Sequence, residues 1–237
     1  MFKFVRAAFC AALALASVAC YSIPSSKSLY ENVLPAQYVL KKSTAPIDTA
    51  SLKTKKLVLI PSENFNAMAK VHAEYYEGGG LADARALTAP LTALTVLAGE
   101  NFDNDRLLVK AHDPRTFADQ VVASLTPYFA SIDSAPDLAS ARDKGADVYG
   151  VIDYYGNVPP GVNIQLQSSW RGQSNLTLLD ADLVEFVAVS GDSTRPFEYG
   201  LLFGSGIAVE AATYTKVMQD NIDQIRAGLR ARLGPPV

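Results

Sequence analysis

Two histidines are the side chains of this sequence best suited to bind a metal ion or to transfer a proton near neutral pH. His72 lies within residues 70–77, and His112 directly precedes Asp113. Neither histidine stands at a spacing typical of a zinc site, and no cysteine lies near either one. We therefore expect surface or helix-capping roles for both histidines, and neither a metal nor another cofactor. The alternative is a site in which a histidine and acidic residues converge in space.

Three short motifs are partial matches to catalytic and ligand-binding signatures. Gly204-Ser205-Gly206 lacks the first glycine of the hydrolase motif G-x-S-x-G, because Phe203 occupies that place. Gly78-Gly79-Gly80 is not followed by the lysine of a phosphate-binding loop, and Asp103-Asn104-Asp105 lacks the later glycine and glutamate of a calcium loop. We expect a hinge with Ser205 as a helix N-cap, a glycine hinge and a turn, respectively.

Asp180 and Asp182 form a pair of carboxylates at the spacing that places two side chains on one face of a strand. Glycosidases use two carboxylates that flank the scissile bond, so an envelope hydrolase is the enzymatic alternative for this chain. Solvated side chains at the end of a strand also account for the pair, and this is the arrangement that we expect. The sequence therefore predicts no catalytic residue and no enzymatic activity.

An uncharged stretch from Ala86 to Ala98 follows the three glycines and is interrupted by Pro90. It is shorter than the roughly 20 residues that span a bilayer. A helix in the core of the domain, or covering it, would account for the stretch. The alternatives are an insert that docks on a partner protein and one that rests in a lipid interface.

The first twenty residues have the organisation of an export signal. Lys3 and Arg6 give a short positive region, and Ala7 to Ala19 is an apolar run that is too short for the roughly 20 residues of a transmembrane helix. We therefore expect residues 1–19 to be the cleaved signal peptide of an exported bacterial protein.

The small residues Ala16-Ser17-Val18-Ala19 before Cys20 resemble the lipobox of bacterial lipoproteins. This resemblance implies that Cys20 is lipidated, carries palmitate and becomes the first residue of the mature chain. Cleavage also removes Cys10, the other cysteine, so no unpaired thiol remains in an oxidising compartment. Tyr21 is not the aspartate associated with retention in the inner membrane, which favours the outer membrane, facing the periplasm. The alternative is an ordinary signal peptide and simple secretion.

The rest of the chain is long enough for one hydrophobic core, since 49% of all residues are hydrophobic. Residues 20–53 have weak periodicity and several prolines, serines and lysines, which is typical of a tether, and we place the globular domain at residues 54–237. A formal net charge of −3 excludes the basic surface that binds nucleic acid. The densest basic stretch, with Arg226, Arg230 and Arg232, favours the solvated end of a helix.

The apolar pattern of the domain predicts a mixed β-sheet flanked by helices, an α/β (α+β) fold. Residues 55–60 form an aliphatic run typical of a buried strand, and residues 147–155 are apolar on both faces, as a central strand is. Asp113-Pro114 favours the start of one helix, and Gly145 the end of a second, whose N-cap we expect at Ser134 or Ala135. The predicted elements are strands at 55–60, 106–110, 128–132, 147–155, 162–170, 175–189 (with a bend at 180–182) and 197–203, a hairpin turn at 190–193, and helices at 113–126, 136–145 and 207–233.

Residues 114–193 resemble the α/β domain shared by the TolB amino-terminal region, the curli-secretion lipoproteins and the lipoprotein activators of peptidoglycan synthases. The resemblance rests on Leu125-Thr126-Pro127-Tyr128-Phe129 at a helix end, on Lys144-Gly145-Ala146-Asp147 before an apolar strand, and on Ser190-Gly191-Asp192 after a long strand. These motifs are structural, and what they imply is a role in binding or assembling a partner in the envelope.

We therefore expect a non-catalytic lipoprotein of the cell envelope that binds a protein partner as an accessory or assembly factor. The alternative from another class is a periplasmic binding module for a lipid or a glycan, with an apolar pocket beneath residues 61–105. An envelope hydrolase is the third hypothesis.

Overall fold

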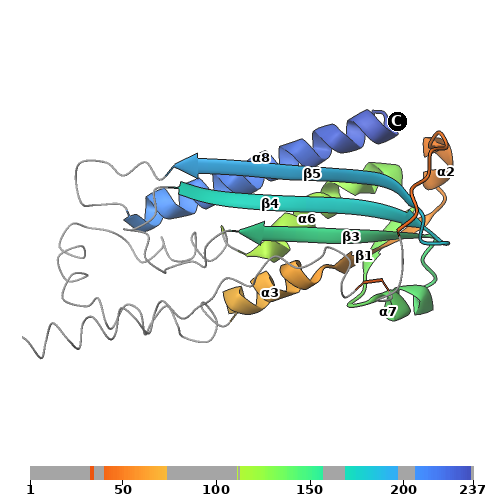
Figure 1. Cartoon of the computed structure of the whole chain (residues 1–237), viewed down its shortest axis with the longest axis horizontal. Coiled ribbons are helices and arrows are strands. Elements are labelled where there is room, and N and C mark those ends of the chain that lie inside the picture. Colours follow the sequence, from red (N-terminus) through yellow and green to blue (C-terminus); the bar gives the residue numbers. More distant parts are fainter. Residues whose placement is uncertain are drawn as a thin grey trace, which may run out of the picture.

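Two parallel strands built from the most apolar runs of the sequence form the centre of the fold (Figure 1). The computed structural model describes residues 33–34, 40–73, 111, 113–156, 169–196 and 206–235. Strand β1 (Lys56–Pro61) pairs with β3 (Val148–Gly156) from Leu57 opposite Val148 to Pro61 opposite Ile152. Burial of both strands on both faces explains why their sequences are almost continuously hydrophobic.

Three further strands complete a five-stranded mixed sheet in the order β2-β1-β3-β4-β5. Strand β2 (Ser131–Ser134) lies parallel to β1 on the side away from β3. Strands β4 (Ser169–Asp180) and β5 (Glu185–Pro196) extend the sheet beyond β3 as antiparallel neighbours, so that β5 is an edge strand. The predicted α/β fold, a mixed sheet flanked by helices, is confirmed.

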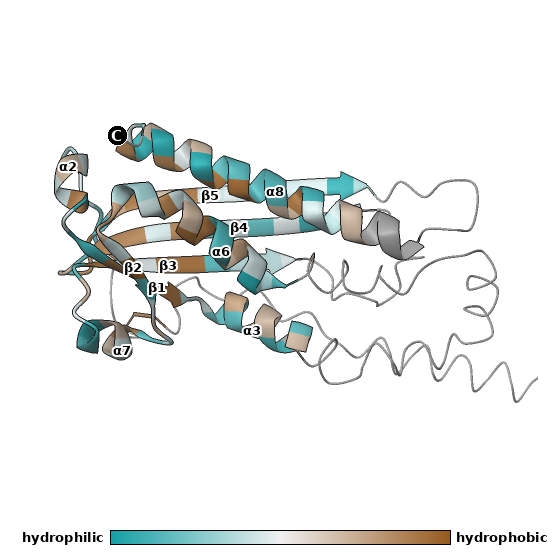
Figure 2. Cartoon of the chain, turned by 180° about the vertical axis from the view of Figure 1, so that it is seen from behind, coloured by the Kyte–Doolittle hydropathy of each residue, from teal (hydrophilic) through white to brown (hydrophobic). Residues whose placement is uncertain are grey.

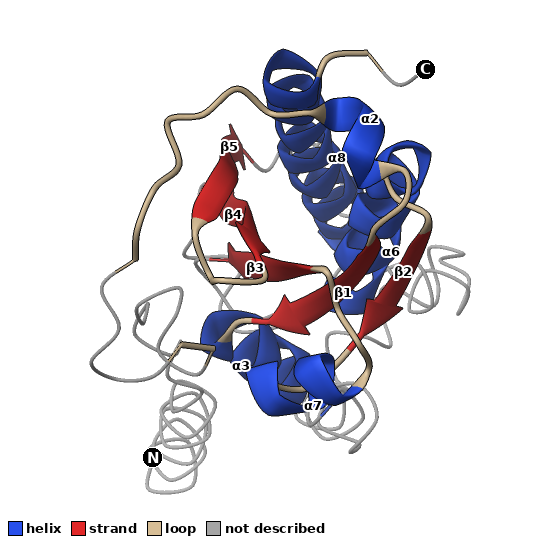
Figure 3. Ribbon diagram, turned by 90° about the vertical axis from the view of Figure 1, so that its right-hand side faces the viewer, coloured by secondary structure: helices blue, strands red, loops and turns tan. Residues whose placement is uncertain are grey.

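Helices cover the sheet on both faces (Figure 3). Helix α6 (Pro114–Leu125) and helix α8 (Gly206–Leu233) pack on one face. Helix α7 (Leu138–Asp143) packs on the other face together with residues 33–34. Hydrophilic and hydrophobic residues alternate along α8 in Figure 2, as they do in a helix with one buried face.

Helix α3 (Glu63–His72) begins directly after β1 and lies beside β3, which is much longer than β1. Its N-cap is Ser62, whose hydroxyl accepts a hydrogen bond from the Phe65 N–H. The short helix α2 (Thr49–Leu52) precedes β1, and its Leu52 belongs to the core beneath α6 and α8.

Several predicted elements are confirmed, because their signals are local. Asp113 caps α6 with Pro114 in the first turn, Gly145 follows α7 at a φ of 69°, and α8 ends at Leu233. The predicted first strand and central strand correspond to β1 and β3.

Four expectations about the elements are wrong. Residues 126–128 form a 3₁₀ turn, so that β2 starts only at Ser131. The N-cap of α7 is Asp137, whose carboxylate accepts the Ser140 N–H at 2.7 Å. Residues 175–189 are not one bent strand, since the chain reverses between Asp180 and Glu185, and residues 190–193 lie inside β5 rather than in a hairpin turn. The predicted strands at 106–110 and 197–203, and residues 162–168 of a third, lie outside the described residues.

Candidate functional site

The strand order changes direction at β1, which places a candidate site at the carboxyl ends of β1 and β3. The chain passes from β1 to β2 on one side and then to β3 on the other, with α6 and α7 on opposite faces. Ligands of open α/β sheets bind outside the carboxyl ends of strands at such a switch point. In this protein Ser62 and Asp153 occupy that position.

Asp153 is a buried carboxylate, only 4% exposed, at the switch point. The Ser62 hydroxyl donates a hydrogen bond to Asp153 Oδ1 at 2.5 Å, and Asn175 Nδ2 donates to Asp153 Oδ2 at 3.1 Å. Each carboxylate oxygen therefore has a donor, which is what a buried charge requires. We call Ser62, Asp153 and Asn175 the switch cluster.

The switch cluster opens onto a polar half of the sheet. Asn175 is paired with Ser190, and the next row along the same face contains Gln173 and Asp192. Tyr149, Val151 and Leu179, by contrast, line the half of this face that α7 covers. The exposed or half-exposed side chains of the polar half, which we call the polar face, are Arg171, Gln173, Asn175, Ser190, Asp192 and Thr194.

The two charged side chains of the polar face, Arg171 and Asp192, form an ion pair. Arg171 donates two hydrogen bonds to the Asp192 carboxylate, and Gln173 Nε2 donates a third at 3.3 Å. The hydrogen bond from Arg171 holds the pKa of Asp192 below its usual value and raises the pKa of Arg171. With side-chain exposures of 49% and 46%, both members of the pair face solvent.

Toward the carboxyl end of β5, at Asp192, the outer edge of the strand is closed by Gln224 of α8. The Asp192 N–H donates to Gln224 Oε1 at 2.9 Å, and Gln224 Nε2 donates to the Asp192 carbonyl at 3.1 Å. A neighbouring strand would make the same two bonds, so this amide occupies the place of a peptide group.

The other end of the β5 edge is closed by the chain before α2. The Glu185 N–H donates to the Lys41 carbonyl at 2.8 Å, and the Ser43 N–H donates to the Glu185 carbonyl at 2.7 Å. Lys42 lies opposite Glu185 in a parallel bridge, and the two side chains form an ion pair with a distance of 3.4 Å.

Between these two closures the backbone of β5 is open. In an antiparallel pair, alternate residues point their N–H and C=O groups away from the partner strand. Ala188 and Ser190 lie four and two residues before Asp192, so their backbone N–H and C=O groups point outward as those of Asp192 do. No described residue bonds to these backbone groups on the outer side. We call this part of β5 the open edge.

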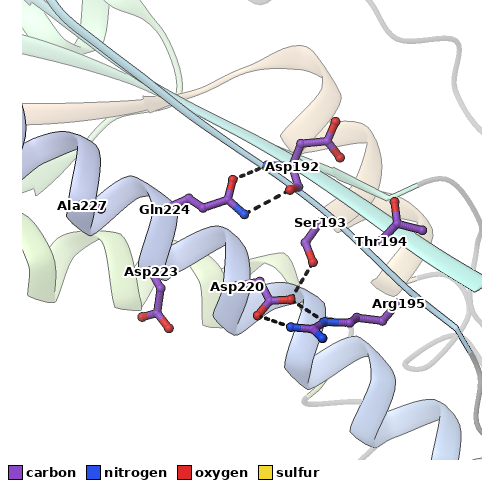
Figure 4. Close-up of a pocket in the computed structure, with 8 residues that line it drawn as sticks. All are labelled: Asp192, Ser193, Thr194, Arg195, Asp220, Asp223, Gln224 and Ala227. Atoms are coloured by element: carbon purple, nitrogen blue, oxygen red, sulfur yellow. Dashed lines mark hydrogen bonds and ion pairs between the residues drawn. The ribbon is translucent and has the colours of Figure 1, made fainter.

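A hollow of about 570 Å³ lies between α8 and residues 192–195 of β5, past Gln224 as seen from the open edge (Figure 4). On its floor the Ser193 hydroxyl donates to Asp220 Oδ2 at 2.6 Å, and Arg195 donates to both oxygens of Asp220 at 2.7 and 2.9 Å. The hydrogen bond from Arg195 is the main reason why the pKa of Asp220 is lower than usual. These side chains are already paired, an arrangement that suits binding rather than proton transfer.

Of the residues singled out in the sequence, His72 is buried in the last turn of α3, so the expected surface role is wrong for it. Asp180 ends β4, and its Oδ1 accepts the amides of Asp182 and Val184, so the two aspartates shape a turn and do not share a strand face. The described structure does not bring these residues together. Cys20, His112, Ser205, Gly78–Gly80, Asp103–Asp105 and residues 86–98 lie outside the described residues.

The three arginines near the C-terminus have two different roles. Arg230 and Arg232 lie in the last turn of α8 and are exposed, as expected. Arg226 instead joins α8 to α6, because its guanidinium donates to Ser124 Oγ at 3.0 Å and to Gln120 Oε1 at 2.9 Å.

Sequence reasoning missed Asp153 and Gln224. Asp153 is the one charged residue within the apolar run 147–155 after its first position, and a charge in the middle of a central strand indicates a buried polar site. Gln224 carries no such signal, because an exposed glutamine in a helix is ordinary.

Within the described parts of the chain, no group of three histidine, cysteine, aspartate or glutamate side chains is arranged to hold a metal ion. None of the described helices is both long and apolar enough to cross a membrane. No protein family, curated protein or solved structure matches this chain.

Proposed function

We propose that the protein is a non-catalytic lipoprotein of the cell envelope whose α/β domain binds a protein partner as an accessory or assembly factor. In this proposal Cys20 carries the lipid and anchors the domain in the outer membrane, facing the periplasm. The signal-like residues 1–19 and the lipobox-like residues 16–20 support the anchor.

The observation that carries the binding role is the open edge of β5. Ala188 and Ser190 offer two N–H and two C=O groups without a described partner, next to the ordered charges of the polar face. Free backbone groups on a sheet edge are a template for an added strand, which is a common way to bind an extended segment of another protein.

The resemblance of residues 114–193 to partner-binding lipoprotein domains agrees with this role. In this proposal the switch cluster is structural, with Ser62 and Asn175 each bonded to one oxygen of Asp153. The ion pairs on the polar face and in the hollow suit the rim of a protein interface, where charged groups set specificity and association rate.

Site-specific photocrosslinking in cells tests the proposal. A photoreactive amino acid replaces Ala188 on the open edge or, as the matched control, Ala139, which is an equally exposed alanine on α7. We expect the position 188 probe to capture one envelope protein and the position 139 probe to capture none or a different set.

A second pair of variants links the capture to the backbone of β5. Ser190→Pro removes an outward N–H while leaving the ladder to β4 intact, whereas Ser190→Thr keeps this donor. We expect the adduct at position 188 to fall several-fold with proline and to persist with threonine, and Cys20→Ala to abolish membrane association. Equal capture by both probes, or equal adducts in both Ser190 variants, would contradict binding at this edge.

A further inference from the structure

The chain before α2 wraps around the edge of the sheet from one face to the other. Val33 and Leu34 are buried in the cluster beneath α7, with exposures of 3% and 8%. Ile47 and Leu52 pack on the opposite face, in the cluster beneath α6 and α8. Figure 3 shows the connecting segment passing outside β5 on its way to α2.

Backbone bonds hold this segment where it crosses the edge. Lys41 and Ser43 bond to the two backbone groups of Glu185, and Lys42 forms an ion pair with the Glu185 side chain, which is only 10% exposed. Farther along, the Thr49 hydroxyl donates to the Leu233 carbonyl at 2.9 Å, at the C-terminal end of α8. We call residues 33–34 and 40–52 the wrap.

The wrap shortens the part of the tether that can extend. A chain spans at most about 3.3–3.6 Å for each residue, whatever its conformation. From Cys20 to Val33 the limit is about 45 Å, whereas it would be about 115 Å from Cys20 to the start of a domain at residue 54. Docking of the wrap, which begins at Val33, therefore removes more than half of the reach that the sequence allows.

We infer that the wrap holds Val33, its first residue, within about 45 Å of the lipid on Cys20, so that the partner of the open edge is a protein at the same membrane. The inference rests on the proposed function, because it uses the anchor at Cys20. The open edge starts next to Glu185, where the wrap itself is bonded, so the binding surface and the wrap share one edge of the sheet.

Energy transfer from the domain to the membrane surface measures this distance. The full mature lipoprotein is reconstituted in phospholipid vesicles with acceptor lipids, and a donor dye is placed on Ala139→Cys, an exposed site on α7. The undocked variant carries Val33→Asp and Leu34→Asp, and the matched control carries Thr44→Asp at an exposed position of the wrap. We expect the undocked variant to move the donor away from the membrane, and the control to keep the distance of the parent protein.

Hydrogen exchange of two amides tests the wrap independently of the membrane. The inference predicts slow exchange of the Ser43 and Glu185 amides in the parent protein. In the undocked variant these two amides should exchange fast, while the Val151 amide in the core still exchanges slowly. If Val151 also exchanges fast, the double variant has unfolded. In that case the single variant Ser43→Pro, which removes only the bond to the Glu185 carbonyl, is used as the undocked protein. Fast exchange at Ser43 and Glu185 in the parent protein, or equal membrane distances in the parent and undocked proteins, would overturn it.

Mass spectrometry of the mature protein separates this inference from the proposed function. An unmodified Cys20 would remove the anchor and with it the proposed lipoprotein, while the exchange of Ser43 and Glu185 would still decide whether the wrap is docked. A lipidated Cys20 together with an undocked wrap would overturn only the restricted reach.

Discussion

At the residue scale, Asp153 is the buried charge on which the switch cluster depends. Asp153→Ala leaves the Ser62 hydroxyl and the Asn175 amide without their acceptor, so we expect the free energy of unfolding to fall by about 2 kcal/mol. Urea titration followed by far-UV circular dichroism measures this change. A loss below about 0.5 kcal/mol would show that the cluster is not a stabilising network.

A swapped pair provides the control for Asp153. Asp153→Asn keeps an oxygen for the Ser62 hydroxyl and turns its N–H₂ toward Asn175, which must then rotate its amide to present Oδ1, whereas Asn175→Asp alone places two carboxylates side by side. Adding Asn175→Asp restores one acceptor and one donor in exchanged positions. We expect the double variant to be more stable than the sum of the two single changes predicts, with a coupling of about 1 kcal/mol.

The ion pair of Arg195 and Asp220 makes stability depend on acidic pH. Arg195 lowers the pKa of Asp220 from its ordinary 3.8 in the folded state, so the pair stabilises the fold above that pH. This stability is lost as pH falls through the lower folded pKa, because the unfolded chain then binds the proton more readily. We expect Asp220→Asn to lower the free energy of unfolding at pH 7 by about 0.5 kcal/mol. Below pH 4 the free energy of unfolding of this variant should decrease less steeply with falling pH than that of the parent protein, as urea titrations over a pH series would show. Parallel pH profiles of the two proteins would contradict this assignment.

At the element scale, the course of the chain after β3 shows where the sequence is informative and where it is not. Gly191 looks like a turn residue in Ser190-Gly191-Asp192, yet it lies within β5. Glycine is required at this position because a side chain there would collide with α8. The real turn contains Leu183 at a φ of 63°, which few leucines adopt, and is fixed by the Asp180 carboxylate. Local rules therefore placed the turn about nine residues too late, since the requirement at Gly191 comes from tertiary packing.

Replacing Gly191 tests this account of the contact between β5 and α8. An alanine Cβ would lie 2.7 Å from Ser174 Oγ and 2.9 Å from the Asn221 carbonyl oxygen, so we expect Gly191→Ala to cost about 2 kcal/mol of stability. Gly145→Ala is the matched control, because its Cβ meets nothing within 4 Å and only the positive φ opposes it, at about 1 kcal/mol. Chemical denaturation compares the two, and an equal or smaller loss for Gly191→Ala would argue against close packing of α8.

The Gln224 side chain protects the β5 edge, and its removal exposes more of that edge. Gln224→Ala frees the N–H and C=O of Asp192, which lengthens the unpaired stretch beyond Ser190. We expect this variant to self-associate measurably in sedimentation velocity while retaining most of its stability. Gln219→Ala, which removes another α8 glutamine, one that bonds to Asp223 of the same helix, serves as the control and stays at the parent size. Identical sedimentation of the parent protein and the two variants would show that Gln224 does not prevent association at the β5 edge.

At the scale of the whole molecule, the sequence predicted the layers better than the connections between them. The apolar stripes of α6 and α8 and the aliphatic runs of β1 and β3 suffice for a mixed sheet covered by helices, since burial of these faces determines the fold class. The wrap could not be predicted in this way. Residues 20–53 have the composition of a tether. Tertiary contacts place the wrap on the domain, some of them with residues more than a hundred positions away, such as Lys42 with Glu185.

Because the wrap contacts both faces of the sheet, the two hydrophobic clusters should unfold as one cooperative unit. Leu34 belongs to the cluster beneath α7, whereas Trp170, the single tryptophan, packs against Tyr214 of α8 at a ring-centroid distance of 4.5 Å. We expect Leu34→Ala to shift the urea transitions of Trp170 fluorescence and of far-UV circular dichroism together, with a loss of about 2 kcal/mol. Thr44→Ala, at an exposed position of the wrap, should leave both transitions in place. A shift in circular dichroism without one in fluorescence would mean that the two faces unfold separately, and the wrap would then be a local attachment that does not couple them.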